Sequence, residues 1–219
     1  MTAPTLERAA LNNALWCASV VRAGGGATHF APTLWWSVRP PPRYYPRAIT
    51  LARALDRGAQ QRLERLEPGD AVKDSFACLP PDGFETLFEA QWYWRRPSPG
   101  GAAAGAVRDP DALAAWIEGW GGGAEILAPA LLAEPGVTFL AEAGAAGVAA
   151  GCALYAGAGL VGVSNLFGEA AAQARLLEAA AAHAGPLPLV TYEQEAEAGP
   201  LLAAGFQPLG PLRVLLRQA

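Results

Sequence analysis

An uncharged segment, residues 143–168, constrains this chain most, because its length could in principle cross a lipid bilayer. Seven glycines interrupt the segment, and its bulky side chains fall into two groups, at 148–155 and 160–167. Between the groups lies Ala156-Gly157-Ala158-Gly159, which has the composition of a turn. We therefore expect two buried strands of a β-hairpin here and not a membrane helix.

Charge and cysteine content exclude several classes of protein. The 219 residues carry 16 basic and 20 acidic side chains, and the net charge of −4 argues against a protein that coats nucleic acid. Glu7 and Arg8 precede any apolar run, which argues against a secretory signal. Cys17, Cys78 and Cys152 stand among apolar neighbours without metal-ligand spacing. We expect a cytoplasmic protein with reduced thiols, no metal site, no membrane association and no nucleic-acid partner.

The distribution of charge suggests two parts of the chain. Residues 1–105 carry 12 basic and 9 acidic side chains, a balance of +3, whereas residues 106–219 carry 4 and 11, a balance of −7. The segment 97–105 contains only Pro, Ser, Gly and Ala, so we expect an exposed connection there. Because a strand at 86–95 could begin the second part, we predict an N-terminal α/β extension over 1–85 and a main domain over 86–219.

Hydrophobic periodicity and capping residues predict the individual elements. Before the connection, we expect helices at 6–22 and 59–66 and strands at 28–38, 72–78 and 86–95. Asp109-Pro110-Asp111 then begins a helix that ends near Trp120. Besides the hairpin, we expect helices at 128–133, 168–183 and 195–204 and strands at 137–141, 187–192, 206–209 and 212–217. This order predicts an α/β fold with a mixed sheet and helices on both faces.

The second half of the chain resembles the GNAT superfamily of acyl-CoA N-acyltransferases. The resemblance lies in the element order, in Leu160-Val161-Gly162-Val163 followed by a helix with Leu176-Leu177, and in Ala204-Gly205-Phe206 before the final strands. It implies a mixed, mostly antiparallel GNAT-like sheet with helices on both faces. It also implies acetyl-CoA or another acyl-CoA as co-substrate, with a splayed fourth strand at the pantetheine and the amides of the next helix at the pyrophosphate.

The resemblance also assigns residues to CoA binding. Five residues after Val163, the family's opening Arg or Gln falls on Gly168, its first glycine on Ala171 and its last small residue on Gln173. All three residue types therefore differ from the family pattern, and Glu169 adds a negative charge beside the expected phosphate. The implied cofactor-binding residues are Val161, Val163, Ser164, Gly168, Ala171 and Gln173.

Candidate catalytic residues lie in two places. The family's proton-donating tyrosine falls on Leu201, which cannot donate a proton, so Tyr192 or Glu193 at the end of the preceding strand could replace it. In Lys73-Asp74-Ser75, strand alternation puts Asp74 on an apolar face, as in many acid/base sites. The alternative is that Asp74 accepts hydrogen bonds from backbone amides at a strand end.

Aromatic and basic residues in the first half also allow two interpretations. Trp35, Tyr44 and Trp92 could hold a substrate, or the aromatic residues could form a core between two layers. Seven arginines between residues 39 and 65, which we call the Arg strip, could be a solvated face. Alternatively the strip could attract an anion such as the CoA 3′-phosphate or RNA.

Two functional hypotheses concern the resemblance, and a third, nucleic-acid binding through the Arg strip, predicts an affinity that falls steeply with salt. The first is a GNAT-like acyltransferase that moves an acetyl or other acyl group from acyl-CoA to a small-molecule amine of unknown identity. The alternative is a catalytically degenerate module of the same fold that binds a small molecule or a protein, as monomer or homodimer. An open cleft between the fourth and fifth strands would favour the enzyme, whereas a cleft filled by the chain's own side chains would favour the module.

Overall fold

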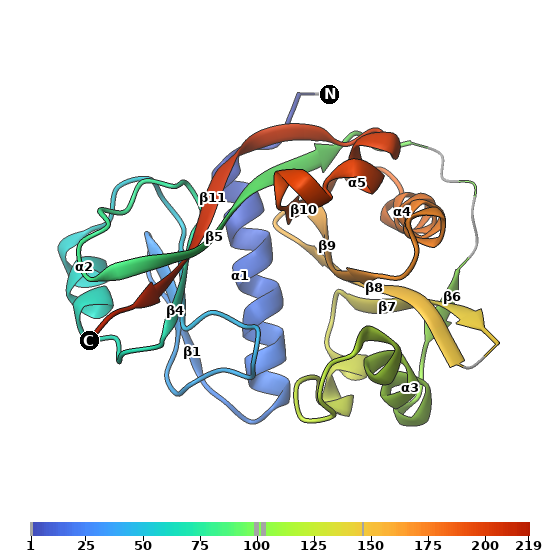
Figure 1. The fold of residues 1–219 in the computed structure, drawn as a ribbon, viewed down its shortest axis with the longest axis horizontal. Helices are drawn as coiled ribbons and strands as arrows, with labels where there is room; N and C mark the ends of the chain where they lie inside the picture. Colours follow the sequence, from blue (N-terminus) through green and yellow to red (C-terminus); the bar gives the residue numbers. More distant parts are fainter. Residues whose placement is uncertain (1, 99–100, 102–103, 146) are drawn as a thin grey trace.

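The computed structural model describes residues 2–98, 101, 104–145 and 147–219, and its strands form a single curved sheet (Figure 1). Only the pairs β3/β4 and β9/β10 are parallel, so the sheet is mixed and mostly antiparallel, as predicted. In order across the sheet, the strands are β1 (Thr28–Phe30), β2 (Leu34–Ser37), β3 (Ala48–Thr50), β4 (Ala71–Asp74), β11 (Gln207–Arg217), β5 (Phe84–Arg95), β10 (Leu189–Glu193), β9 (Leu160–Phe167), β8 (Gly147–Gly157), β7 (Val137–Gly144) and β6 (Gly105–Val107).

The long N-terminal helix α1 (Leu6–Ala23) lies inside the arch of the sheet, between the N-terminal strands and the strands β8 and β9 (Figure 1). It begins at Thr5, whose Oγ1 accepts a hydrogen bond from the Arg8 N–H at 3.3 Å. Alanine, tryptophan, cysteine and valine side chains of this helix are buried. Because it contacts strands of both halves of the chain, α1 fixes how the N-terminal residues meet the C-terminal sheet.

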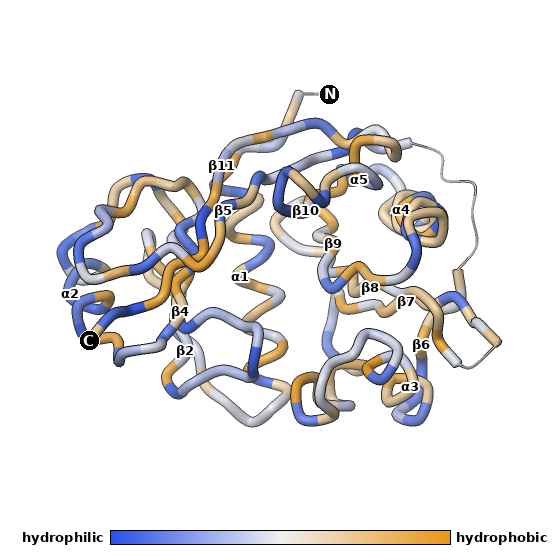
Figure 2. Tube along the Cα trace, in the orientation of Figure 1, coloured by the Kyte–Doolittle hydropathy of each residue, from blue (hydrophilic) through white to orange (hydrophobic). Residues whose placement is uncertain are grey.

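Helices cover both faces of the sheet, as the element order predicted. On the outer face, α4 (Ala170–Ala184) and α5 (Gly199–Ala203) pack with β8, β9 and β10, and on the inner face α1 is joined by α3 (Pro110–Trp120) and the 3₁₀ helix η1 (Pro129–Ala133). The short α2 (Arg57–Glu64) covers a smaller core at the N-terminal end. Hydrophobic residues gather in the strands, whereas α2 is largely hydrophilic (Figure 2).

The uncharged segment forms the predicted hairpin. Strands β8 and β9 pair antiparallel and are joined by Ala158 and Gly159, whose φ angles are 54° and 69°. Two successive positive φ angles characterise a two-residue hairpin turn, which explains the small residues found there. No helix in the described residues is long and apolar enough to span a membrane.

Several predicted elements differ in the structure: the strand expected at 72–78 ends at Asp74, and the helix expected at 128–133 is the 3₁₀ helix η1. The strand expected at 28–38 is a hairpin, because Pro32 interrupts the ladder between β1 and β2. The two closing strands are one strand, β11, with a register shift between Pro208 and Gly210 that absorbs the break in the pattern. The helix expected at 195–204 divides into a 3₁₀ turn, Glu195–Glu197, and α5.

Strand β5 lies in the middle of the sheet and not at the position of a first strand. It pairs with β10 on one side and with β11 on the other, and β11 also pairs with β4. The sheet is therefore continuous across residues 85 and 86, where the sequence suggested a boundary. Of the connection expected at 97–105, residues 99, 100, 102 and 103 lie outside the described residues.

Candidate functional site

Strands β9 and β10 diverge and leave an opening in the sheet. They pair only through Leu189 with Val161 and through Val190 with Gly162, although every residue of both strands is described. A register shift against β8 accompanies Asn165, which has a φ of 52° within β9. This β-bulge turns the end of β9 away from its neighbour, so the backbone beyond Gly162 is free of the β10 ladder.

A cavity of about 220 Å³ occupies this opening, which we call the notch. Val163 and Leu201 belong to the core on the α4 side of the sheet, whereas Trp16 and Tyr45 belong to the core on the α1 side. Because the cavity touches both cores, it reaches through the sheet between the two diverging strands. It is lined by Asn13, Trp16, Cys17, Tyr44, Tyr45, Pro46, Lys73, Phe88, Val163, Ser164, Asn165, Leu166, Thr191, Tyr192, Glu193, Gln194 and Leu201.

Five of the predicted site residues line the notch: Tyr44, Val163, Ser164, Tyr192 and Glu193. Tyr44 is 60% exposed, and its ring meets that of Trp120 at a centroid distance of 5.7 Å. It therefore stands at the rim of the cavity, where a ligand would enter.

Two predicted substrate-binding tryptophans lie outside the cavity lining. Trp92 supports Tyr192 through an edge-on ring contact at 5.4 Å, and its Nε1–H donates to the Ser75 carbonyl at 3.0 Å. Trp35 is fully buried in the core on the α1 side. Of the three aromatic residues proposed from sequence, only Tyr44 therefore faces the notch, because the indole rings of Trp35 and Trp92 are buried in the core.

Asp74, proposed as an acid/base residue, lies outside the cavity lining and has structural partners. Its carboxylate accepts hydrogen bonds from the Cys78 N–H at 3.2 Å and the Leu79 N–H at 2.9 Å. It also accepts one from the Arg213 guanidinium at 2.7 Å, with only 1% of the Asp74 side chain exposed. This geometry matches the alternative in which the carboxylate satisfies amides at a strand end.

Backbone donors are free at the start of α4, beside the end of β9. None of the described residues accepts a hydrogen bond from the N–H groups of Ala170, Ala171 or Ala172, and the Glu169 side chain makes no capping hydrogen bond. The first intrahelical bond runs from the Gln173 N–H to the Glu169 carbonyl at 2.9 Å. These three amides and the helix dipole together form an environment that stabilises an anion.

Gly168 explains why this turn departs from the family pattern. Its φ is 106°, and a Cβ at this position would collide with the Ala150 side chain and lie 2.9 Å from the Ala149 carbonyl oxygen. An Arg or Gln therefore cannot occupy this position without moving β8. Gln173 lies one turn later, where its side-chain amide donates to the Gly168 carbonyl at 2.8 Å and closes the turn.

Glu193 is the carboxylate of the notch. Partial burial raises the pKa of this carboxyl group, a hydrogen bond from the Gln194 N–H opposes the rise, and the neighbouring Glu197 adds to it. A carboxylate whose pKa lies above its usual range accepts a proton more readily near neutral pH. Glu193 is therefore suited to act as a general base.

Sequence reasoning missed Tyr45, which lies deep in the notch. Its Oη donates to the side-chain oxygen of Asn165, the residue of the β-bulge, at 3.5 Å. Burial raises the pKa of Tyr45 well above its usual range, and the nearby Cys17 and Tyr192 raise it further. The phenol thus keeps its proton at neutral pH. The sequence around Tyr44-Tyr45-Pro46 carries no signal of a contact with β9.

Lys73 and Asn13 form a second group that the sequence pattern did not bring together. The Lys73 Nζ donates to the Asn13 Oδ1 at 2.7 Å and lies 4.0 Å from the centre of the Tyr192 ring. Lys73 is only 3% exposed. Cys17 lies on α1, four residues after Asn13 and therefore on the same face of that helix. Burial raises the pKa of the Cys17 thiol to about 11, and the Lys73 ammonium opposes the rise. The one available signal was that this chain has a single lysine.

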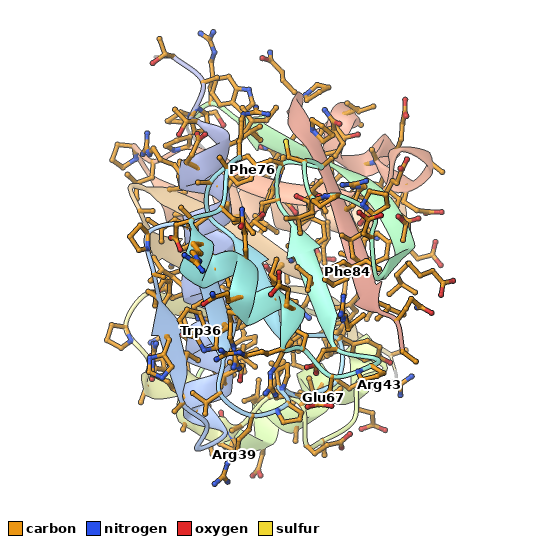
Figure 3. The ribbon with its side chains drawn as sticks, turned by 90° about the vertical axis from the view of Figure 1, so that its left-hand side faces the viewer. Trp36, Arg39, Arg43, Glu67, Phe76 and Phe84 are labelled. Atoms are coloured by element: carbon orange, nitrogen blue, oxygen red, sulfur yellow. The ribbon has the colours of Figure 1, made fainter. Side chains whose placement is uncertain are left out.

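Figure 3 shows two members of the Arg strip, Arg39 and Arg43, toward the lower part of the side of the molecule that carries α2. Several of its members have local partners. Arg47 pairs with Asp70 at 3.8 Å, Arg53 lies over the Phe76 ring at 5.6 Å, and Arg62 lies over the Trp36 ring at 5.7 Å. These contacts accord with a solvated face that covers apolar rings.

Solved structures share this fold over nearly the whole chain. A GCN5-related N-acetyltransferase from Kribbella flavida aligns with a TM-score of 0.66 at 12% identity, over 96% of this chain and 95% of that one. A protein from Novosphingobium aromaticivorans, described as a GNAT-family acetyltransferase, aligns at 0.59 and 13%, over 93% and 99%. A GCN5-related N-acetyltransferase from Sphaerobacter thermophilus aligns at 0.51 and 12%, over 97% and 93%. No protein-family model and no curated protein sequence matches the chain.

Proposed function

Because the chain has the GNAT fold, as its sequence suggested, we propose that it transfers an acyl group from acyl-CoA to an amine. The observation that carries this proposal is the notch: β9 and β10 separate at a β-bulge and enclose a cavity that reaches through the sheet. A thioester entering from one side and an amine from the other would meet there. Holding two reactants in register supplies much of the acceleration in such reactions.

The residues at the α4 side fit the CoA moiety. The amides of Ala170, Ala171 and Ala172 would receive the pyrophosphate, and the edge of β9 beyond Gly162 that β10 leaves unpaired, at Val163, would receive the pantetheine amides. The acidic Glu169 opposes the phosphate charge, so the amides would carry the attraction without help from a cationic side chain. In this proposal CoA is held mainly by backbone groups, so binding does not require the side chains that the family resemblance implies.

Proton transfer is assigned to two side chains of the notch. Glu193 would accept the proton that the amine loses as its nitrogen bonds to the thioester carbonyl carbon. When the carbon–sulfur bond breaks, Tyr45 would donate its phenolic proton to the departing thiolate, because its raised pKa keeps it protonated. The backbone N–H groups that the bulge releases near Val163 would stabilise the negative charge on the carbonyl oxygen.

Calorimetry of the full chain with CoA and acetyl-CoA tests the proposal. We expect saturable binding of acetyl-CoA, and no heat at about 1 mM of either ligand would disprove the enzyme. Ala170→Pro removes one α4 amide donor at the first helical position, where proline is tolerated, and should weaken binding about tenfold. Ala170→Ser keeps the amide and is the matched control. Equal loss in both variants would show that the amide is not the contact.

One observation favours the degenerate module as a second candidate. Leu201 lines the notch at the position where the family resemblance implies the proton-donating tyrosine, and only 3% of Leu201 is exposed. In a module of this kind, CoA or another ligand would bind without turnover. Acetyl-CoA binding that persists with no thiol release across a broad amine panel would support this candidate over the enzyme.

A further inference from the structure

We propose that Lys73 and Asn13 bind a carboxylate of the acceptor, so that the acceptor is a small amine that also carries a carboxylate, such as an amino acid. The proposal rests on the acyl transfer proposed above and names the substrate class for the same site. It is carried by a buried ammonium group that lines the notch on the α1 side of the sheet.

Lys73 has no anionic partner among the described residues. No carboxylate oxygen lies within 4.0 Å of its Nζ, and its partners are the neutral Asn13 amide and the Tyr192 ring. The carboxylate next in sequence, Asp74, is taken up by Arg213. A buried ammonium is costly unless it is paired, so this geometry is suited to a counter-charge that arrives with a ligand.

The nearby Cys17 thiol does not provide that charge. Burial raises its pKa to about 11, so the sulfur is protonated at neutral pH. Its Sγ lies 3.9 Å from the Asn13 side-chain oxygen. The Lys73 ammonium and the Cys17 thiol therefore both donate to the Asn13 side-chain oxygen, and the neutral thiol does not balance the charge of the ammonium.

Asn13 offers a second donor in a defined direction. Because an ammonium only donates hydrogen bonds, the amide must present its oxygen to Lys73. The Asn13 Nδ2 then has no acceptor among the described residues, and Asn13 also lines the cavity. Lys73 and Asn13 together provide N–H donors for the two oxygens of one carboxylate.

The cavity has a complementary group for the amine of the same molecule. Glu193 lines the same cavity as Lys73, but the two side chains form no ion pair. The cavity therefore presents a negative and a positive group that do not neutralise each other. A volume of about 220 Å³ admits a molecule of amino-acid size. A zwitterion would match both charges, with its carboxylate at Lys73 and its amine at Glu193, beside the bulge where the thioester would lie.

Binding and turnover of matched ligand pairs test this inference. In the first experiment, the full chain is saturated with CoA and its thermal unfolding is measured with each of the common amino acids and with the corresponding amino acid amides. In a separate assay with acetyl-CoA, acetyl transfer to each of these compounds is followed by thiol release. At least one amino acid should raise the unfolding midpoint and be acetylated with a kcat/KM at least tenfold above that of its amide. Stabilisation by none of the amino acids, or equal effects of acid and amide, would overturn the proposal.

Two variants separate recognition from structure. Lys73→Met should abolish the preference for acid over amide, measured as the ratio of the two kcat/KM values. Asn13→Asp should do the same by supplying an internal counter-charge to Lys73, and it serves if Lys73→Met does not fold. A preference for the acid that survives in the folded variants would refute the assignment. CoA calorimetry tests the proposed CoA site independently of this acceptor site, because Lys73 lies on the other side of the sheet from α4.

Discussion

The two halves of the chain contribute different things to the notch. The half after residue 105 supplies the diverging strands, the bulge and the amides of α4, most of which are backbone features. The N-terminal half supplies side chains: Asn13, Trp16 and Cys17 from α1, Tyr45 from the loop between β2 and β3, and Lys73 from β4. The comparison teaches that the donor side depends on backbone geometry, which tolerates sequence change. The acceptor side depends on particular side chains, namely those of the N-terminal half together with Glu193 of β10.

The largest expected effect concerns the ion pair that joins the halves. Asp74→Ala leaves the Arg213 guanidinium and the amides of Cys78 and Leu79 without their acceptor, and should lower the free energy of unfolding by about 3–5 kcal/mol. Urea unfolding measures this loss. Where the variant is folded, its kcat should equal that of the wild type. A selective loss of kcat with normal stability would restore Asp74 as an acid/base residue.

Tyr45 tests whether the N-terminal half takes part in the chemistry itself. Tyr45→Phe should reduce kcat about 100-fold with little change in KM, because the leaving thiolate loses its proton donor. Steady-state rates of thiol release measure the effect. Tyr192→Phe is the matched control, as that ring would still face the Lys73 ammonium. If Tyr192→Phe is the slower variant, the proton donor belongs to β10, where the sequence placed it.

Two buried tryptophans compare the packing of the halves. The Trp116 Nε1–H donates to the Leu140 carbonyl at 2.9 Å, whereas the Trp35 Nε1 has no partner among the described residues. Trp116→Phe should therefore cost about 1–3 kcal/mol of stability. Trp35→Phe should cost less, about 1 kcal/mol, because it removes an unsatisfied donor. Denaturant midpoints decide the order, and a costlier Trp35→Phe would show that Trp35 is the more tightly packed of the two.

The smallest effect is the pH dependence of Glu193. Its pKa is higher in the folded chain than in the unfolded one, so the wild type loses stability as pH rises through the folded pKa. Glu193→Gln lacks this loss and should unfold at a slightly higher temperature at pH 7, with no difference at pH values below the unfolded pKa. Its acyl transfer should nevertheless be slower. Melting curves across pH check the sign, and a variant less stable at pH 7 would contradict it.

The sequence predicted the C-terminal architecture because its signals are local. Alternating apolar runs, the turn at Ala158-Gly159 and the capping residues of α3 all act within a few residues. The position of β5 was not predictable in this way, since it depends on pairing with residues that lie 94 to 133 positions away in the sequence, from Leu189 with Arg95 to Arg217 with Phe84. The same reason hid the group at Lys73 and Asn13, which only tertiary packing brings to 2.7 Å.

The position of β11 has a consequence for how the chain folds. This strand follows all the others in sequence, yet it lies between β4 and β5, and it is the only strand that pairs with both. During synthesis, the sides of β4 and β5 that will face β11 stay without their partner until residues 207–217 leave the ribosome. Lys73 on β4, which we assign to binding of the acyl acceptor, is thus among the last residues to reach its final environment. Until then, the unpaired strand edges expose nascent chains to edge-to-edge aggregation.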